Sequence, residues 1–326
     1  MARIGINGFG RIGRYLVRLM AERNEFPVVI NARADNASLA HLFKYDSVHH
    51  TFKGTVGHDE NGIIINGTHI AVTRCKPNEW QWKDYGVDLV VESTGTIKKR
   101  AGLAEHMACG AKKVIMSAPV SDADITIVMG VNDGLYDPAK HDVVSSASCT
   151  TNCLAPVAKV LNDTFGIGHG LMTTIHSYTM SQRILDGSQK DIRRARAAMS
   201  MIPTTTGAAK AVALVLPELK GKLDGIAIRV PTPNVSIVDL NCVMKRDVTV
   251  DEVNAALTAA ANDNFGVSDE PLVSIDYNGD THGGVVDLLS TSVMSGNMLK
   301  VLIWYDNEAG FTNQLLRLIT MVAGKM

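Results

Sequence analysis

The sequence of 326 residues has no long apolar run and no surplus of charge. No stretch reaches the roughly 18 consecutive apolar residues of a membrane-spanning helix, and the N-terminus enters a strand pattern without the features of a signal peptide. The 32 basic and 33 acidic residues give a formal net charge of −1, which favours neither nucleic acid nor a membrane as a partner. We therefore expect a cytoplasmic protein that holds any anionic ligand with local cations.

Cysteines are few, odd in number and scattered. Their spacing has no zinc-like pairing, so we expect reduced thiols, no disulfide framework and no metal site. The five are Cys75, Cys109, Cys149, Cys153 and Cys242. Repeats and low-complexity tracts are absent too, and the length suits about two domains around large cores.

The N-terminal residues carry a glycine pattern in a specific setting. An apolar strand at 2–7 is followed by Gly8-Phe9-Gly10-Arg11-Ile12-Gly13 and then by apolar residues at helical spacing, and a second strand follows at 26–31. In a dinucleotide-binding turn, Gly8 permits the turn, Gly10 lets the backbone approach a pyrophosphate, and Gly13 lets helix and strand come close. The alternative is a purely structural glycine turn.

Strands and helices alternate through the rest of the first half. We expect strands at 87–92, 113–117, 126–129 and 143–146, a helix at 100–109, and a hairpin excursion over 54–72 marked by two Asn-Gly pairs. This order predicts an α/β fold with a doubly wound parallel Rossmann sheet over residues 1–148. A ligand would lie at the carboxyl ends of the strands, where Asn31, Ser93 and Ser117 fall.

The pattern changes after Cys149. Long strands at 171–175, 225–230, 235–243 and 300–304 and a helix at 250–261 predict a second, α+β catalytic domain over 149–309 with a mostly antiparallel sheet. The last helix, within 310–326, is expected to pack back on the first domain.

The triplet Ser148-Cys149-Thr150 stands where a small-residue loop gives way to a helical pattern. The N-terminus of a helix favours an anion, so a thiolate would be stabilised there, and His176 is a candidate base. The alternative is that Cys149 is a small core residue. For Cys153, one helical turn further on, burial is the expected state.

The densest cationic stretch, 191–196, precedes a hydroxyl-rich turn at 203–209. Such a run is usually a solvated face, but guanidinium with hydroxyls and backbone amides is also how proteins bind phosphate. A second set of this kind pairs Thr179 with Arg229.

Four motifs together are specific: Ile6 to Arg14, Ala147 to Cys153, His176-Ser177-Tyr178-Thr179, and Trp304 to Glu308. Through them the chain resembles the phosphorylating glyceraldehyde-3-phosphate dehydrogenases over essentially its whole length. The resemblance implies a glycolytic oxidoreductase, usually a homotetramer, that converts glyceraldehyde 3-phosphate and inorganic phosphate to 1,3-bisphosphoglycerate with reduction of NAD or NADP.

The resemblance also implies roles for particular residues. Cys149 would be the nucleophile that forms a hemithioacetal and then a thioester, and His176 the base. Thr179 and Arg229 would hold the substrate phosphate, and the attacking phosphate would be held by Ser148, Thr150, Arg194, Thr206 and Gly207. Cofactor-binding positions would be Gly8, Phe9, Gly10, Arg11, Ile12, Asn31, Ala32, Arg33, Arg74, Ser93, Ser117, Ser188 and Asn307.

Two departures bear on the choice of cofactor. Members that use NAD end the second strand in Asn-Asp, but here Ala32 and Arg33 follow Asn31, and Ser188 replaces the usual proline of a later loop. Without that carboxylate a 2′-phosphate is not repelled, so NADP is favoured or both cofactors are used. The alternative is that Asp35 is the ribose carboxylate and NAD is preferred.

Smaller departures are Met180, Phe311 and a segment at 195–202 that is one residue short, and we expect them to alter fine geometry only. One competing function is an erythrose-4-phosphate dehydrogenase, against which Tyr178-Thr179 favours the triose phosphate. Another is a scaffold or nucleic-acid-binding protein without turnover.

Overall fold

The computed structural model describes residues 2–326, which divide into two compact units. The first unit holds the chain through Ile127, Asp133–Ala147 and Leu315–Met326. The second holds Val128–Asn132 and Ser148–Gln314. No helix within 2–326 is long and apolar enough to cross a membrane.

A nine-stranded sheet forms the first unit, in the order β3-β4-β5-β2-β1-β6-β7-β9-β8. The strands are β1 (Ile4–Asn7), β2 (Val29–Asn31), β3 (Val56–His58), β4 (Gly62–Ile65), β5 (Thr68–Thr73), β6 (Leu89–Glu92), β7 (Lys113–Met116), β8 (Ile125–Thr126) and β9 (Val143–Ser145). All pairs from β5 to β8 are parallel, which confirms the Rossmann sheet. The expected hairpin exists, but it is part of this sheet because β5 pairs with β2.

Three helices belong to the first unit: α1 (Arg11–Glu22), α2 (Asn36–Lys44) and α3 (Arg100–Ala108). Helix α1 forms because its apolar residues recur on one face and are buried, Leu16 and Val17 fully. We did not expect α2 from the sequence. It begins after Asp35, whose side chain accepts a hydrogen bond from the backbone N–H of Ser38 and so caps the helix.

A seven-stranded sheet forms the second unit, in the order β11-β12-β10-β13-β16-β15-β14. The strands are β10 (Ile167–Ser177), β11 (Ile202–Thr205), β12 (Leu223–Val230), β13 (Ser236–Met244), β14 (Gly266–Ser268), β15 (Val285–Met294) and β16 (Met298–Tyr305). The pairs β10–β12 and β14–β15 are parallel and the other four are antiparallel, so the mostly antiparallel sheet is confirmed. Sequence reasoning missed β15.

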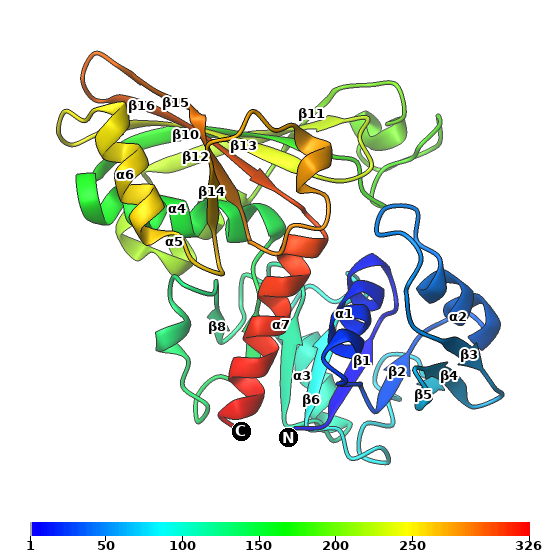
Figure 1. The fold of residues 1–326 in the computed structure, drawn as a ribbon. Helices are drawn as coiled ribbons and strands as arrows, with labels where there is room; N and C mark the ends of the chain where they lie inside the picture. Colours follow the sequence, from blue (N-terminus) through cyan, green and yellow to red (C-terminus); the bar gives the residue numbers. More distant parts are fainter. Residues whose placement is uncertain (1) are drawn as a thin grey trace. The chain divides into compact units, whose positions relative to one another are not determined.

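One face of this second sheet is covered by α4 (Cys149–Phe165), α5 (Ala208–Val215) and α6 (Val250–Ala260) (Figure 1). Alternate residues of β13 are buried, as expected for a strand with one covered face. The last helix, α7 (Ala309–Gly324), starts in the second unit and ends in the first. Short 3₁₀ turns lie at Asp133–Leu135, Ile192–Ala195, Pro217–Leu219 and Ser274–Tyr277.

Candidate active site

Cys149 is the first residue of α4 and is partly accessible. Ser148 caps the helix, because its Oγ accepts from the backbone N–H of Thr151 at 3.1 Å. Its role here is therefore at least structural. The thiol stands where the first backbone N–H groups of a helix have no partner within the helix.

His176 lies on β10 with its Nε2 3.5 Å from the Sγ of Cys149. The imidazole is 5% exposed. The ring of Tyr305 on β16 packs against it edge-on, with 5.9 Å between the two ring centroids. The hydroxyl of Tyr305 is 2.9 Å from Thr150 Oγ1 and 2.7 Å from Thr174 Oγ1. Tyr305 thus joins the start of α4 to β10. Sequence reasoning gave it no role, although it lies in a motif that we singled out.

Arg229 stands beside His176 because β10 and β12 pair in parallel with these two residues in register. Its guanidinium donates to the carbonyl of Ser177 at 2.8 Å and lies 2.8 Å from His176 Nδ1. His176 Nδ1 also lies 2.7 Å from the same carbonyl. With the proton on Nδ1, that atom donates to Ser177 and the Nε2 atom that faces the thiol can accept its proton; with the proton on Nε2, Nδ1 accepts from Arg229.

Burial dominates the electrostatics of this pair. Burial, and secondly the charge of Arg229, lower the pKa of His176 to about 3. Burial also raises the pKa of Cys149, against the smaller opposing effects of Arg229 and of hydrogen bonding with Thr150. Both shifts oppose the thiolate that the start of a helix favours, so a stabilised thiolate at Cys149 stays a prediction.

The candidates for phosphate binding all belong to the second unit. Arg194 lies in the 3₁₀ turn Ile192–Ala195, with its guanidinium near Asp191 and Thr204, and its charge lowers the pKa of Arg229 after the larger effect of burial. Two like charges that act on each other make an anion site between them favourable. Thr179 follows β10, and its hydroxyl is 2.9 Å from the hydroxyl of Ser181.

Thr206 and Gly207 lie at the start of α5. Gly207 is the N-cap residue and offers no side-chain cap, and a Cβ placed on it would meet nothing within 4 Å. The Ala208 amide donates to Thr206 Oγ1 at 3.2 Å, and the missing Cβ leaves space beside Gly207 for an anion. Thr150 differs, because its side chain is buried against Tyr305.

Asn307 is held by a rigid loop between β16 and α7. Its Oδ1 accepts from Ser236 Oγ at 2.8 Å, which leaves its Nδ2 to donate elsewhere. Asp306 fixes the loop: it accepts from the backbone N–H groups of Glu308 and Ala309 and from Asn234. Sequence reasoning missed the part played by Asp306.

In the first unit the glycine turn has the features that a pyrophosphate requires. Gly8 has φ +102°, and a Cβ on Gly13 would lie 2.2 Å from the carbonyl oxygen of Gly8. Gly10 caps α1 without a side chain, and a Cβ on it would meet nothing within 4 Å. The open position therefore lies at Gly10, where the N-terminus of α1 can bind phosphate, and the residues present fit a dinucleotide.

Other cofactor candidates in this unit are engaged with neighbours. Phe9 stacks on Phe43, Ser93 donates to the Gly8 carbonyl, and Ser117 donates to the Glu92 carbonyl. Ile12 lies in the first turn of α1, and Arg11 pairs with Asp46 at 2.5 Å. Asp46 is buried, which raises its pKa, but its bonds to Arg11 and to the amides of His49 and Val48 bring that pKa down to about 2.

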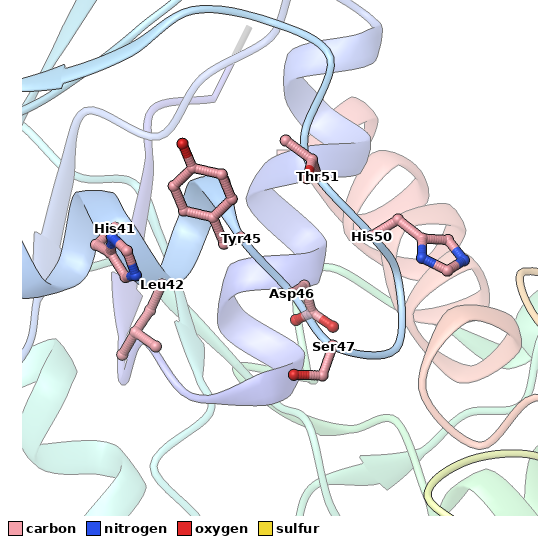
Figure 2. Close-up of a pocket in the computed structure, with 7 residues that line it drawn as sticks. All are labelled: His41, Leu42, Tyr45, Asp46, Ser47, His50 and Thr51. Carbon is pink, nitrogen blue, oxygen red and sulfur yellow. The ribbon is translucent and has the colours of Figure 1, made fainter.

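Asp46 also lines a surface hollow formed by the end of α2 and the loop after it (Figure 2). The other residues of this hollow are His41, Leu42, Tyr45, Ser47, His50 and Thr51. It contains none of the residues that we expected to bind a ligand, so we assign it no role.

The end of β2 carries the residues that bear on cofactor choice. Ala32 is buried, and Arg33 is exposed. Asp35 uses both carboxylate oxygens to bind Ser38, and Arg74 donates to the Ala34 carbonyl at 2.8 Å. Ser188 and Asn307 belong to the second unit. Among residues 2–326, no three His, Cys, Asp or Glu side chains are grouped so as to hold a metal ion.

A Rossmann sheet with an open glycine turn, and a thiol beside an imidazole and a guanidinium, define a nicotinamide-dependent aldehyde dehydrogenase. Family models for the NAD binding domain and the C-terminal domain of glyceraldehyde 3-phosphate dehydrogenase match residues 2–100 and 148–307. The chain belongs to this family.

Curated relatives agree over the whole chain. A glyceraldehyde-3-phosphate dehydrogenase of Bacillus cereus is 58% identical, with 100% of this chain and 99% of the relative covered. One of Geobacillus stearothermophilus is 56% identical, with 99% and 98% covered. One of Nostoc sp. is 48% identical, with 100% and 99% covered.

Proposed function

We propose that this protein catalyses the phosphorylating oxidation of glyceraldehyde 3-phosphate to 1,3-bisphosphoglycerate, with reduction of NAD or NADP. The observation that carries this is the 3.5 Å contact between Cys149 Sγ and His176 Nε2, with Arg229 beside it. The relatives in Bacillus and Geobacillus bear the name of this activity. We assign residues 1–148, with the C-terminal helix 310–326, to the cofactor, and residues 149–309 to catalysis.

Catalysis begins with the thiol. As Cys149 Sγ attacks the aldehyde carbon, its proton passes to His176 Nε2 and from there to the carbonyl oxygen, which becomes the hydroxyl of a hemithioacetal. The proton moves within the pair, so this transfer leaves the net charge of the pair unchanged. That matters because charging one group alone in a buried site is costly.

The oxidation follows from the hemithioacetal. A bound nicotinamide cofactor supplies the acceptor for the hydrogen and two electrons that leave the carbon. His176 takes the hydroxyl proton, so the carbon becomes the carbonyl of a thioester on Cys149. Asn307, fixed by Ser236, would hold the carboxamide of the cofactor through Nδ2.

Inorganic phosphate then attacks the thioester carbon, a C–O bond forms, and the C–S bond breaks to release the thiolate. We propose that Arg229 and Thr179 hold the phosphate of the substrate. Ser148, Thr150, Arg194, Thr206 and Gly207 would hold the attacking phosphate. The open space beside Gly207 and the guanidinium of Arg194 support this assignment.

We further propose that the protein uses NADP at least as well as NAD. The rival carboxylate, Asp35, has both oxygens occupied in capping α2. Arg33 and Arg74 lie at the end of β2 and the segment beside it, where a 2′-phosphate would find positive charge. Ser188 would add a hydroxyl.

A homotetramer is the oligomeric state that we propose. Residues 180–201 expose six large apolar side chains, each between 50% and 93%: Met180, Ile184, Leu185, Ile192, Met199 and Met201. So much exposed apolar surface in one segment favours cover by a second copy of the chain. Light scattering of the purified protein tests this, and a monomer would contradict it.

Initial rates test the function. We expect reduction of NADP and of NAD with glyceraldehyde 3-phosphate, and a strong dependence of the rate on inorganic phosphate. A larger specificity constant for erythrose 4-phosphate would point to the rival dehydrogenase. Salt-dependent binding of nucleic acid without any aldehyde oxidation would point to the scaffold instead.

A further inference from the structure

A continuous row of polar side chains, buried except at Thr73, runs along the carboxyl edge of the first sheet. Asn7, Asn31, Thr73 and Glu92 are the last residues of β1, β2, β5 and β6, and the parallel register sets them side by side. Asn31 Nδ2 donates to Asn7 Oδ1 at 2.8 Å, and Thr73 Oγ1 donates to Asn31 Oδ1 at 3.0 Å. This edge is where a parallel sheet binds its ligand.

Glu92 is fully buried at the end of this row, next to Asn7. Its carboxylate accepts from Asn7 Nδ2 at 2.5 Å, from the Thr94 amide at 2.8 Å, from the Thr94 hydroxyl, and from His106. Burial alone would raise the pKa of Glu92, but the bonds from His106, Thr94 and Asn7 outweigh it and lower that pKa. A protonated carboxyl would point its O–H at one of these donors.

His106, on α3, is held in one tautomer by Trp82. The indole N–H can only donate, and it lies 3.0 Å from His106 Nδ1, so Nδ1 carries no proton. The proton is therefore on Nε2, 3.1 Å from Glu92 Oε2. His106 is neutral, and every donor to the Glu92 carboxylate is uncharged.

The carboxylate joins the two turns that the cofactor is proposed to meet. Asn7 precedes the turn at Gly8, and Thr94 lies in the turn after β6. The turns touch: a Cβ on Gly8 would lie 2.7 Å from the Thr94 amide nitrogen, and Ser93 Oγ donates to the Gly8 carbonyl at 2.8 Å. A buried charge is a poor means of gaining stability alone, since apolar residues can often replace it without loss. We infer that the buried carboxylate of Glu92 serves instead to fix the turn at Gly8 and the turn after β6 relative to each other.

We propose that Glu92 is a positioning residue for the nicotinamide cofactor, and that His106 keeps its carboxylate ionised and oriented by donating from Nε2. The inference rests on the proposed placement of the pyrophosphate at the Gly10 turn. Four donors need four acceptor sites, and only an ionised carboxylate at this position supplies them.

The first test is Glu92→Gln. The new side chain carries an amide N–H group, which would face one of the donors that now bind the carboxylate. We expect the Kd for NADP⁺ and for NAD⁺, measured by calorimetry, to rise about tenfold, as for one misplaced buried hydrogen bond. The kcat at saturating cofactor should stay within about threefold of the original, since a cofactor that is already bound accepts the hydrogen at the same rate. Tyr136→Phe is the control, because that hydroxyl is buried in the same unit without a partner, and its Kd should not change.

A matched pair tests His106. The amide nitrogen of His106→Gln can donate to Glu92 much as Nε2 does, so this variant should keep a Kd close to the original. His106→Leu removes the donor and should weaken binding by a factor close to that of Glu92→Gln. If Glu92→Gln fails to fold, this pair decides.

Unchanged cofactor binding in a folded Glu92→Gln protein would overturn the proposal, as would equal Kd values for the two His106 variants. The proposed function fails separately, if the unmodified protein binds cofactor with normal Kd and does not oxidise the aldehyde.

Discussion

Replacing Arg229 by leucine removes a guanidinium that serves two partners in the candidate active site. In the free protein it donates to the Ser177 carbonyl and acts on Cys149 and His176 through its charge. In the proposed complex it also binds the phosphate of the substrate. Its removal should therefore lower the rate for every aldehyde, and lower it most for the phosphorylated one.

The ratio between two aldehydes isolates the phosphate contact. A charge-assisted hydrogen bond contributes about 1.5–3 kcal/mol, which corresponds to about 10- to 150-fold. We expect Arg229→Leu to reduce kcat/KM for glyceraldehyde 3-phosphate by that factor relative to unphosphorylated glyceraldehyde. The loss common to both aldehydes reports the disturbance of the Cys149–His176 pair.

The assay is steady-state kinetics at saturating cofactor and phosphate with both aldehydes. Arg246→Leu serves as control, because Arg246 is half-exposed, pairs with Glu252, and should change neither value. Alkylation with iodoacetamide as a function of pH reports the thiol separately: the charge of Arg229 lowers the pKa of Cys149, so its loss should move the profile to higher pH. Equal losses for both aldehydes would refute the phosphate assignment and leave Arg229 a structural residue.

Other variants probe the remaining assignments. Cys149→Ser should bind cofactor normally and lose turnover, because a serine alkoxide is much harder to form than a thiolate; near-normal activity would exclude the covalent route. His176→Asn should slow the reaction by about 10²- to 10⁴-fold, as for loss of a general base. The folded pKa of His176, about 3, lies below the unfolded value near 6.5, so the unfolded chain binds a proton first as the pH falls. The unmodified protein should therefore lose up to about 1.4 kcal/mol of unfolding free energy per pH unit below 6.5. Denaturant titrations of His176→Asn should lack this contribution. Tyr305→Phe leaves two buried threonine hydroxyls without their partner, which should cost about 1–3 kcal/mol of stability by the same titrations and lower kcat; an unchanged kcat would deny Tyr305 a part in placing the thiol. Ala32→Asp combined with Ser188→Pro should shift preference from NADP towards NAD, and a protein that never used NADP would show our interpretation of Ala32 to be wrong.

Much of the fold follows from local patterns in the sequence. The glycine turn between an apolar strand and a helix gave the dinucleotide unit, and long alternating strands gave the second sheet. Helix α2 was missed because its start depends on a single cap, Asp35, in a segment that we had considered only for ligand binding. The antiparallel strand β15 was missed because its residues carry no clear alternation, and a shift in its register with β16 interrupts the pairing.

The site is harder to predict, because its geometry depends on pairing between distant segments. Arg229 is 53 residues from His176, and only the parallel register of β10 and β12 sets them side by side. Tyr305 is 155 residues from Thr150 and lies on a third element. Sequence supplied the residue types, and the sheet supplies the contacts.

The protonation state of the thiol shows why the contacts matter. At the level of sequence, a helix N-terminus and a histidine both favour the thiolate of Cys149. In the folded chain, burial raises the pKa of the thiol and lowers that of His176, so both shifts oppose ionisation of either group alone. The thiolate can form by proton transfer from Sγ to Nε2 across the 3.5 Å contact, which exchanges one neutral pair for one ion pair. The charge of Arg229 opposes the imidazolium and favours the thiolate, so a substrate phosphate that neutralises Arg229 acts on the two halves of this ion pair in opposite directions.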